Sequence, residues 1–126
     1  MRVLLIDDIP DQVRKYQKVI KDLGHQVEAV DDSRLAEDLL GEEKFDAVIS
    51  DVQMPYVSGY EIVYRIWAFK LDLPCLLHSS ESRYSTGHEW IDLERVHEKF
   101  PFVTFHLKRR DVEPYYIKEF LDSLKN

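Results

Sequence analysis

Two short apolar runs in this chain end directly in aspartate. Residues 3–6 are followed by Asp7 and Asp8, and residues 47–50 are followed by Asp51. Aliphatic and β-branched runs of this length are typical of buried strands. If the two strands are neighbours, three carboxylates meet at their ends and repel one another. A divalent cation, which prefers hard oxygen ligands, would relieve that repulsion, so the sequence predicts a candidate metal site there.

The composition is typical of one soluble globular domain. The chain has 126 residues, 44% of them hydrophobic, and no linker or repeat, so we expect residues 1–126 to form a single domain. The net charge of −7 argues against nucleic acid as a partner. No apolar run is long enough to insert into a membrane, and a cytoplasmic location is the simplest expectation. Cys75 and the five histidines lack metal-site spacing, and we expect structural or surface roles for them.

Strand and helix patterns alternate along the chain, which indicates an α/β fold. Strands are expected at residues 2–6, 26–30, 45–50, 74–77 and 102–107. A helix is expected after each strand, because apolar side chains recur there at intervals of three and four residues. Five such units predict a parallel sheet covered by helices on both faces.

Two capping boxes mark expected helix starts, at residues 58–61 and 86–89. The first predicts a helix that buries Trp67 among its apolar residues. The second predicts a helix with Trp90 on its core face, ahead of the last strand. Asp111 is expected to cap the final helix.

Ligands of open α/β sheets bind beyond the carboxyl ends of the strands. The polar residues expected at that edge are Asp7, Asp8, Asp51, Ser79 and Lys108. This set suits phosphoryl transfer, which depends on positioning and on neutralising the phosphoryl oxygens. Asp7 and Asp8 suit Mg²⁺, whereas Asp51 could be both a metal ligand and a nucleophile that needs no general base. Lys108 would neutralise phosphoryl charge, and Ser79 would donate a hydrogen bond to a phosphoryl oxygen.

The same residues carry a resemblance to a known family. Over its whole length the chain resembles the receiver domain of bacterial two-component response regulators, in their stand-alone, single-domain form. The most specific pieces are Asp7-Asp8, the run at residues 51–55 followed by Gly59, Ser79-Ser80 and Lys108. The resemblance implies a flavodoxin-like, doubly wound five-stranded parallel sheet of order 2-1-3-4-5 with five flanking helices.

The resemblance also implies a function and its parts. Asp51 would accept a phosphoryl group from a histidine kinase or phosphotransfer protein, with Mg²⁺, or Mn²⁺ in its place, as cofactor. The metal would be held by Asp8 directly, by Asp7 through water, by Asp51, and by the backbone carbonyl of Gln53. Beyond self-phosphorylation and autodephosphorylation, no enzymatic activity is expected.

A switch and an output surface are implied as well. Ser79 would be the switch hydroxyl, Lys108 the phosphoryl partner and Phe105 the aromatic that reorients. The signal would reach an unknown downstream protein through the fourth helix, fifth strand and fifth helix. The alternative that these elements also form a homodimer stays open.

Two departures from the family pattern concern that output surface. Arg109 follows Lys108, where the family usually has proline, and the segment 80–107 is about two helical turns longer than the pattern. A pseudo-receiver that acts as a constitutive interaction module is therefore the alternative function. An aspartyl phosphohydrolase is disfavoured because Gln53 stands where a second acid would be needed. A flavin-binding module is disfavoured because Asp7 and Asp8 would repel its phosphate.

Overall fold

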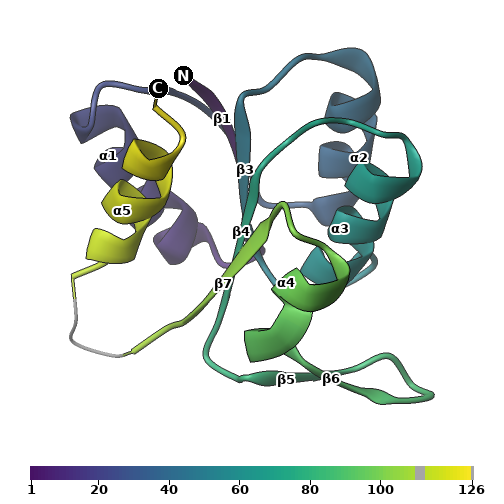
Figure 1. The fold of residues 1–126 in the computed structure, drawn as a ribbon. Helices are drawn as coiled ribbons and strands as arrows, with labels where there is room; N and C mark the ends of the chain where they lie inside the picture. Colours follow the sequence, from purple (N-terminus) through teal and green to yellow (C-terminus); the bar gives the residue numbers. More distant parts are fainter. Residues whose placement is uncertain (110–112, 126) are drawn as a thin grey trace.

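A single five-stranded sheet lies between two layers of helices (Figure 1). The computed structural model describes residues 1–109 and 113–125. The elements, in chain order, are β1 (Arg2–Ile6), α1 (Pro10–Asp22), β2 (Gln26–Val30), α2 (Ser33–Glu42), β3 (Ala47–Asp51), α3 (Gly59–Ala68), β4 (Cys75–Ser79), β5 (Arg83–Ser85), β6 (Trp90–Asp92), the 3-10 turn η1 (Leu93–Arg95), α4 (Val96–Lys99), β7 (Val103–Leu107) and α5 (Tyr115–Ser123). No helix in the described part of the chain is long and apolar enough to cross a membrane.

The strand order of the main sheet is β2-β1-β3-β4-β7, and every pair in it is parallel. This order confirms the predicted flavodoxin-like fold, with the two strands of the hairpin β5–β6 standing outside the sheet. β1 and β3 are direct neighbours, with Ile6 opposite Ser50. The residues that follow these two strands therefore meet at one edge of the sheet.

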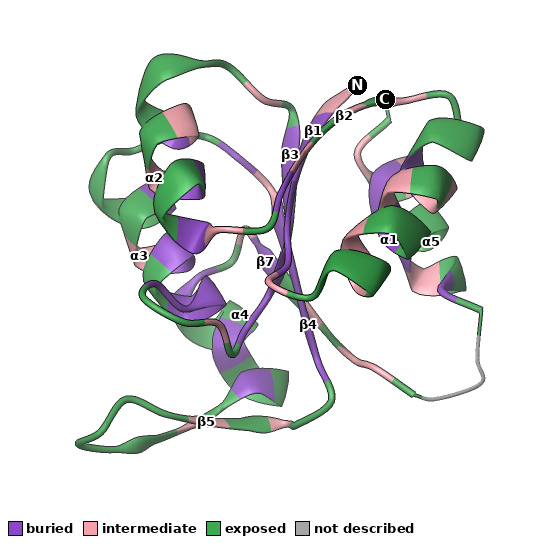
Figure 2. Cartoon of the chain, turned by 180° about the vertical axis from the view of Figure 1, so that it is seen from behind, coloured by how far each residue is buried: buried purple, intermediate pink, exposed green. Residues whose placement is uncertain are grey.

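Two apolar clusters fill the two sides of the sheet, because side chains alternate along each strand. Helices α1 and α5 cover one face, and α2, α3 and α4 cover the other (Figure 1). Figure 2 shows the central strands buried between these layers. On the first side Leu5 and Ile49 pack with Ile117 of α5, and on the second Leu4 packs in the cluster that contains Phe100.

The capping box at residues 58–61 begins α3 as predicted. The Ser58 hydroxyl accepts a hydrogen bond from the backbone N–H of Glu61 at 3.1 Å. The expectation that this helix buries Trp67 is wrong, because the side chain is 58% exposed. Ile62 and Ile66 face the core instead, and Trp67 follows them on the solvent side of the last turn.

The second capping box, at residues 86–89, does not begin a helix. The Thr86 hydroxyl accepts hydrogen bonds from the backbone N–H groups of His88 and Glu89, but it does so inside the turn of an antiparallel hairpin. Gly87 has a φ of +93°, which a right-handed helix does not accommodate. Trp90 is consequently 62% exposed rather than in the core.

Only the last turns of the helix predicted for this region form, as η1 and α4. Asp92, rather than Thr86, supplies the cap, and its carboxylate accepts from the backbone N–H of Glu94 at 3.1 Å. Leu93, Val96 and Phe100 are buried as predicted. The hairpin β5–β6 thus accounts for the extra length between β4 and β7, and α4 is left with four residues.

The last helix, α5, begins at Tyr115, with Pro114 at its N-cap position. The predicted cap Asp111 lies outside the described residues. Ile117, Phe120 and Leu121 bury one side of α5 against the sheet.

Candidate functional site

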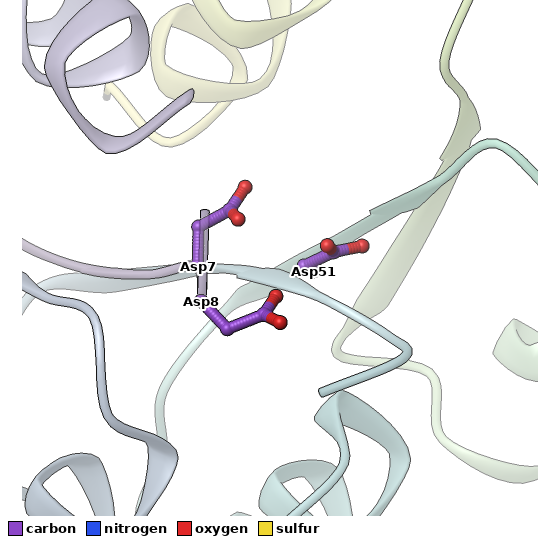
Figure 3. A group of neighbouring side chains, drawn as sticks. All are labelled: Asp7, Asp8 and Asp51. Carbon is purple, nitrogen blue, oxygen red and sulfur yellow. The ribbon is translucent and has the colours of Figure 1, made fainter. Parts of the chain in front are cut away.

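Three carboxylates meet at the carboxyl ends of β1 and β3. One oxygen from each of Asp7, Asp8 and Asp51 lies within 4.8 Å of the others (Figure 3). Asp7 is fully buried and Asp51 is 9% exposed. These residues come together because β1 and β3 are neighbours in the sheet, which was the condition set for the predicted site.

The local backbone satisfies only part of the hydrogen-bonding capacity of these acids. Asp7 Oδ1 accepts from the backbone N–H of Ile9 at 3.0 Å, and Asp51 Oδ1 accepts from that of Val52 at 2.9 Å. Within the described part of the chain, the buried atoms Asp7 Oδ2 and Asp8 Oδ1 have no hydrogen-bond partner. Buried, charged oxygens without donors are costly. Hard oxygen ligands of this kind fit a divalent cation such as Mg²⁺.

Lys108 extends from the end of β7 into this cluster. Its Nζ lies 3.6 Å from Asp7 Oδ2 and 3.6 Å from Asp51 Oδ1, and it donates a hydrogen bond to Gln12 Oε1 at 2.8 Å. The backbone N–H of Lys108 donates to the carbonyl of Ser79 at 2.7 Å, which fixes the end of β7 against β4. One ammonium does not balance three carboxylates, so the site retains negative charge for a cation.

Burial shifts the ionisation of these acids. Loss of solvent is the main cause that raises the pKa of Asp51 to about 6, against the opposing effect of the Lys108 ammonium and with a further rise from Asp7. Burial also raises the pKa of Asp7, whereas its hydrogen bond from Ile9 lowers it. A bound cation would favour the ionised forms of these carboxylates, so metal binding and deprotonation are coupled.

Gly59 supports Asp51 from the start of α3. Its N–H donates to the carbonyl of Val52 at 2.8 Å. A Cβ at this position would overlap the carbonyl oxygen of Asp51 and would lie 3.0 Å from the Cα of Val52. Only glycine lets the backbone of α3 approach the end of β3 this closely.

Comparison with known proteins identifies the family. The model of the response regulator receiver domain matches residues 3–97. The chain belongs to the response regulator receiver domain family. The match ends ahead of β7 and α5, the part of the receiver that carries Lys108. Receiver domains of this family accept phosphoryl groups, bind Mg²⁺ at an acidic pocket, and interact with histidine kinases or phosphotransfer proteins.

Curated relatives share part of this sequence. The two-component response regulator ORR26 of Oryza sativa subsp. japonica is 34% identical over 87 residues, which are 68% of this chain and 15% of the relative. The sensor histidine kinase RcsC of Escherichia coli strain K12 is 34% identical over 76 residues, which are 60% of this chain and 8% of the relative. The receiver thus spans a small part of the length of the relatives it matches.

Solved structures share the fold over nearly the whole chain. The response regulator TrrA of Thermotoga maritima, in complex with Mg(2+)-BeF, has a TM-score of 0.77 at 22% identity and matches over 98% of both chains. The chemotaxis protein CheY4 of Vibrio cholerae has a TM-score of 0.74 at 23% identity, again over 98% of both chains. Both likenesses support the receiver fold.

The remaining predicted site residues lie at or near the same edge of the sheet. Ser79 is 3% exposed, and its hydroxyl accepts from the backbone N–H of Glu81 at 3.1 Å. Phe105, on β7, is half-buried and packs against the cluster under α2, α3 and α4. Gln53 is exposed, two residues after Asp51, so its side chain is free of the core. The roles predicted for these three residues stay predictions.

A polar contact beside the site, between His78 and Tyr116, was missed by the sequence reasoning. His78 lies opposite Asp51 in the sheet register and is fully buried, which agrees with the structural rather than the surface role expected for the histidines. Tyr116 of α5 forms a hydrogen bond with it. The available signal was a histidine at an inward-facing position of an otherwise apolar strand.

Proposed function

We propose that Asp51 accepts a phosphoryl group from a phosphohistidine donor, in a Mg²⁺-dependent step, and that the receiver then signals through a protein contact. The observation that carries this proposal is the group of three carboxylates with unsatisfied buried oxygens, facing the ammonium of Lys108 at 3.6 Å. A purely structural core would not gather like charges in this way.

Each residue has a defined part in the transfer. A carboxylate oxygen of Asp51 attacks the phosphorus, the new O–P bond forms an acyl phosphate, and the P–N bond breaks with the imidazole of the donor as leaving group. Asp8, Asp7 and Asp51 would hold the metal, with the backbone carbonyl of Gln53. A bound Mg²⁺ supplies positive charge for the phosphoryl oxygens and lowers the repulsion between donor and acid.

The chain's own cation and hydroxyl complete the site. Lys108 gives up its present hydrogen bond to Gln12 and instead neutralises the charge of a phosphoryl oxygen. The Ser79 hydroxyl donates a hydrogen bond to another phosphoryl oxygen, which is compatible with its acceptance of a hydrogen bond from the backbone N–H of Glu81. Mn²⁺, which has similar oxygen-ligand preferences, would substitute for Mg²⁺.

A groove of about 280 Å³ borders Asp8, whereas neither Asp7 nor Asp51 lines it. Asp31 and Tyr56 lie on its walls, in the loops after β2 and β3. The donor is a histidine kinase or phosphotransfer protein, and we place the transfer in the cytoplasm.

The output surface in this proposal is formed by α4, β7 and α5, with Phe105 as the residue that reorients. The unusual form of this surface favours one second candidate, a constitutive interaction module without a switch. The observation behind it is that α4 has only four residues and is preceded by the hairpin β5–β6. Partner affinity that does not change on addition of beryllofluoride and Mg²⁺ would support this second candidate.

The experiment that tests the first proposal is intact-mass spectrometry after treatment with acetyl phosphate. The wild-type protein is expected to gain one phosphoryl group with Mg²⁺ and none with EDTA. Asp51→Asn is expected to abolish the gain. Asp31→Asn is the matched control, because Asp31 also follows a strand at this edge but is exposed and outside the carboxylate group, and it should retain the gain. A wild-type protein that stays unmodified with Mg²⁺ present would contradict the proposal.

A further inference from the structure

A group of four rings lies behind Lys108, on the side of the sheet that α1 and α5 cover: His78 and Tyr16 are buried, Tyr116 is half-buried and His106 is exposed. His78 of β4 is fully buried, and its Nδ1 is 2.8 Å from the hydroxyl of Tyr116 on α5. The ring of Tyr16 on α1 lies 4.8 Å from that of His78, measured between centroids. His106 of β7 stacks on Tyr116, with centroids 3.9 Å apart and ring planes 12° apart.

Tyr116 therefore contacts β4, which ends in Ser79, and β7, which is followed by Lys108. Its hydroxyl reaches β4 one residue before Ser79, and its ring covers β7 two residues before Lys108. His78 and His106 are direct neighbours in the sheet register. Side chains alternate along a strand, so Lys108 extends on the same side as His106. Its Nζ is 5.4 Å from the centroid of Tyr16, at the edge of this ring group.

The charges of Lys108 and Asp51 affect the pKa values of two of these rings, His78 and Tyr116. The pKa of His78 is held well below its usual value, first by burial and second by the positive charge of Lys108. Burial raises the pKa of Tyr116, and the charge of Asp51 adds to the rise. Both groups are therefore neutral around neutral pH, and the contact between them is a hydrogen bond between uncharged partners.

Packing alone does not explain His78. An aliphatic side chain would fill this strand position without the cost of burying an imidazole. Within the described residues His78 Nε2 has no hydrogen-bond partner, so the Tyr116 hydroxyl is the imidazole's single compensating contact. A costly polar pair of this kind fixes one orientation of the rings, which apolar contacts do less strictly.

The position of the end of β7, which is followed by Lys108, depends on contacts of this kind. Arg109 follows Lys108, and its φ lacks the constraint near −65° that a proline would impose. Beyond the backbone hydrogen bond to Ser79, the stack of His106 on Tyr116 is a contact that reaches this end of the strand from the α5 side.

We propose that Tyr116 is a positioning residue for Lys108, which it holds at the carboxylates through its hydrogen bond with His78 and its stack on His106. The same contacts tie the first turn of α5 to the occupancy of the site. When Lys108 moves from Gln12 to a phosphoryl oxygen, His106 moves with the strand end, and Tyr116 carries this displacement to α5. This last step rests on the proposed phosphorylation of Asp51, whereas the positioning of Lys108 does not.

The first test reads the position of Lys108 without any phosphoryl donor. Tyr116→Phe keeps the ring and removes the hydroxyl. In NMR spectra of lysine-labelled protein, this variant is expected to shift the side-chain signals of Lys108 while the fold, followed by its thermal melt, stays intact. Tyr115→Phe is the matched control, because Tyr115 is the preceding residue of α5 and is 68% exposed, so the Lys108 signals should stay in place. Unchanged Lys108 signals in Tyr116→Phe would overturn the proposal.

The second test is a double-mutant cycle on the rate of phosphorylation by acetyl phosphate with Mg²⁺. Tyr116→Phe is expected to slow the wild-type protein about fivefold, the factor that matches the loss of one buried hydrogen bond between neutral groups. In a Lys108→Ala background the same change should have no further effect, because Tyr116 acts through Lys108. His78→Leu should reproduce both results and provides a second variant.

The two tests separate the failure of this inference from that of the proposed function. Equal slowing by Tyr116→Phe in both backgrounds would show a general structural effect and overturn the positioning role. A wild-type protein that accepts no phosphoryl group would defeat the proposed function, and the NMR comparison would then still decide the positioning of Lys108.

Discussion

Asp51 is subject to two opposing electrostatic effects. Burial and the neighbouring acids disfavour its charge, whereas Lys108 favours it. The transfer that we propose needs the ionised carboxylate as nucleophile, so the site holds Asp51 in an unfavourable state that a metal ion or a phosphoryl group can relieve. The free-energy cost of keeping Asp51 ionised affects the stability of the protein as well as its reactivity.

The stability of the metal-free protein should therefore depend on the ionisation of Asp51. Because folding raises the pKa of Asp51 to about 6, the folded state binds this proton more tightly than the unfolded chain. As pH rises from the unfolded pKa through the folded one, the unfolded chain ionises first, and the folded state loses stability. Above that window the cost is complete, and it is at most about 3 kcal/mol.

Asp51→Asn should remove this cost. In EDTA, the variant is expected to be more stable than wild type by about 1 to 3 kcal/mol at about pH 7.5, with a much smaller difference at about pH 4. Urea unfolding at the two pH values measures both differences. A variant that is less stable than wild type at the higher pH would show that burial of the Asp51 charge does not destabilise the folded state.

The three acids were predictable at the residue scale because each follows an apolar run that is visible in the sequence. Their meeting was not predictable from the runs alone, since it depends on which strands are neighbours. The contact between His78 and Tyr116 was not predicted for a related reason. The two residues are 38 positions apart, and no local sequence pattern connects them.

At the scale of single elements, the contrast between the two capping boxes is instructive. The same Ser/Thr-x-x-Glu spacing caps α3 at Ser58 but closes a hairpin turn at Thr86. Side-chain hydroxyls satisfy backbone N–H groups in turns as readily as at helix ends. The decisive difference is the positive φ of Gly87. In addition, the buried apolar residues with helical spacing begin only at Leu93.

The start of α3 is the element on which the geometry of Asp51 depends most. Gly59→Ala should push α3 away from the end of β3, because the new Cβ would overlap the backbone of Asp51 and Val52. Overlap with backbone that cannot shift freely is expected to cost about 1 to 3 kcal/mol. Thermal unfolding measures the loss, and phosphorylation by acetyl phosphate should slow as Asp51 moves.

Gly41→Ala is the matched control for this change. Gly41 lies within α2, and a Cβ there meets nothing within 4 Å. The substitution should stabilise the protein by up to about 1 kcal/mol through helix propensity alone. If Gly59→Ala behaved like Gly41→Ala, the close approach of α3 to β3 would be wrong.

At the scale of the whole molecule, the alternating strand and helix patterns were enough to predict a parallel sheet covered on both faces. The order of its strands came from the resemblance to receiver domains, and the structure confirms it. The part that differs from prediction lies between β4 and β7, where the added length forms a hairpin. The family match also ends in this region, at residue 97.

Metal binding should stabilise the entire fold, because the repelling carboxylates are set by the sheet and separate when it unfolds. Free Mg²⁺ at ten times its dissociation constant is expected to add about 1.4 kcal/mol to the free energy of unfolding. This corresponds to a rise in Tm of about 4 to 8 °C for a chain of this size. The rise should vanish in Asp8→Asn and persist in Asp31→Asn. Equal rises in both variants would place the metal elsewhere.

The most direct measurement for the central claim is to locate the acyl phosphate in the chain. After treatment with acetyl phosphate and Mg²⁺, borohydride reduces an aspartyl phosphate to homoserine, and tandem mass spectrometry of the peptides reads its position. The account predicts homoserine at position 51 and at no other aspartate, with none formed in EDTA. Homoserine at another aspartate, with position 51 unmodified, would contradict it.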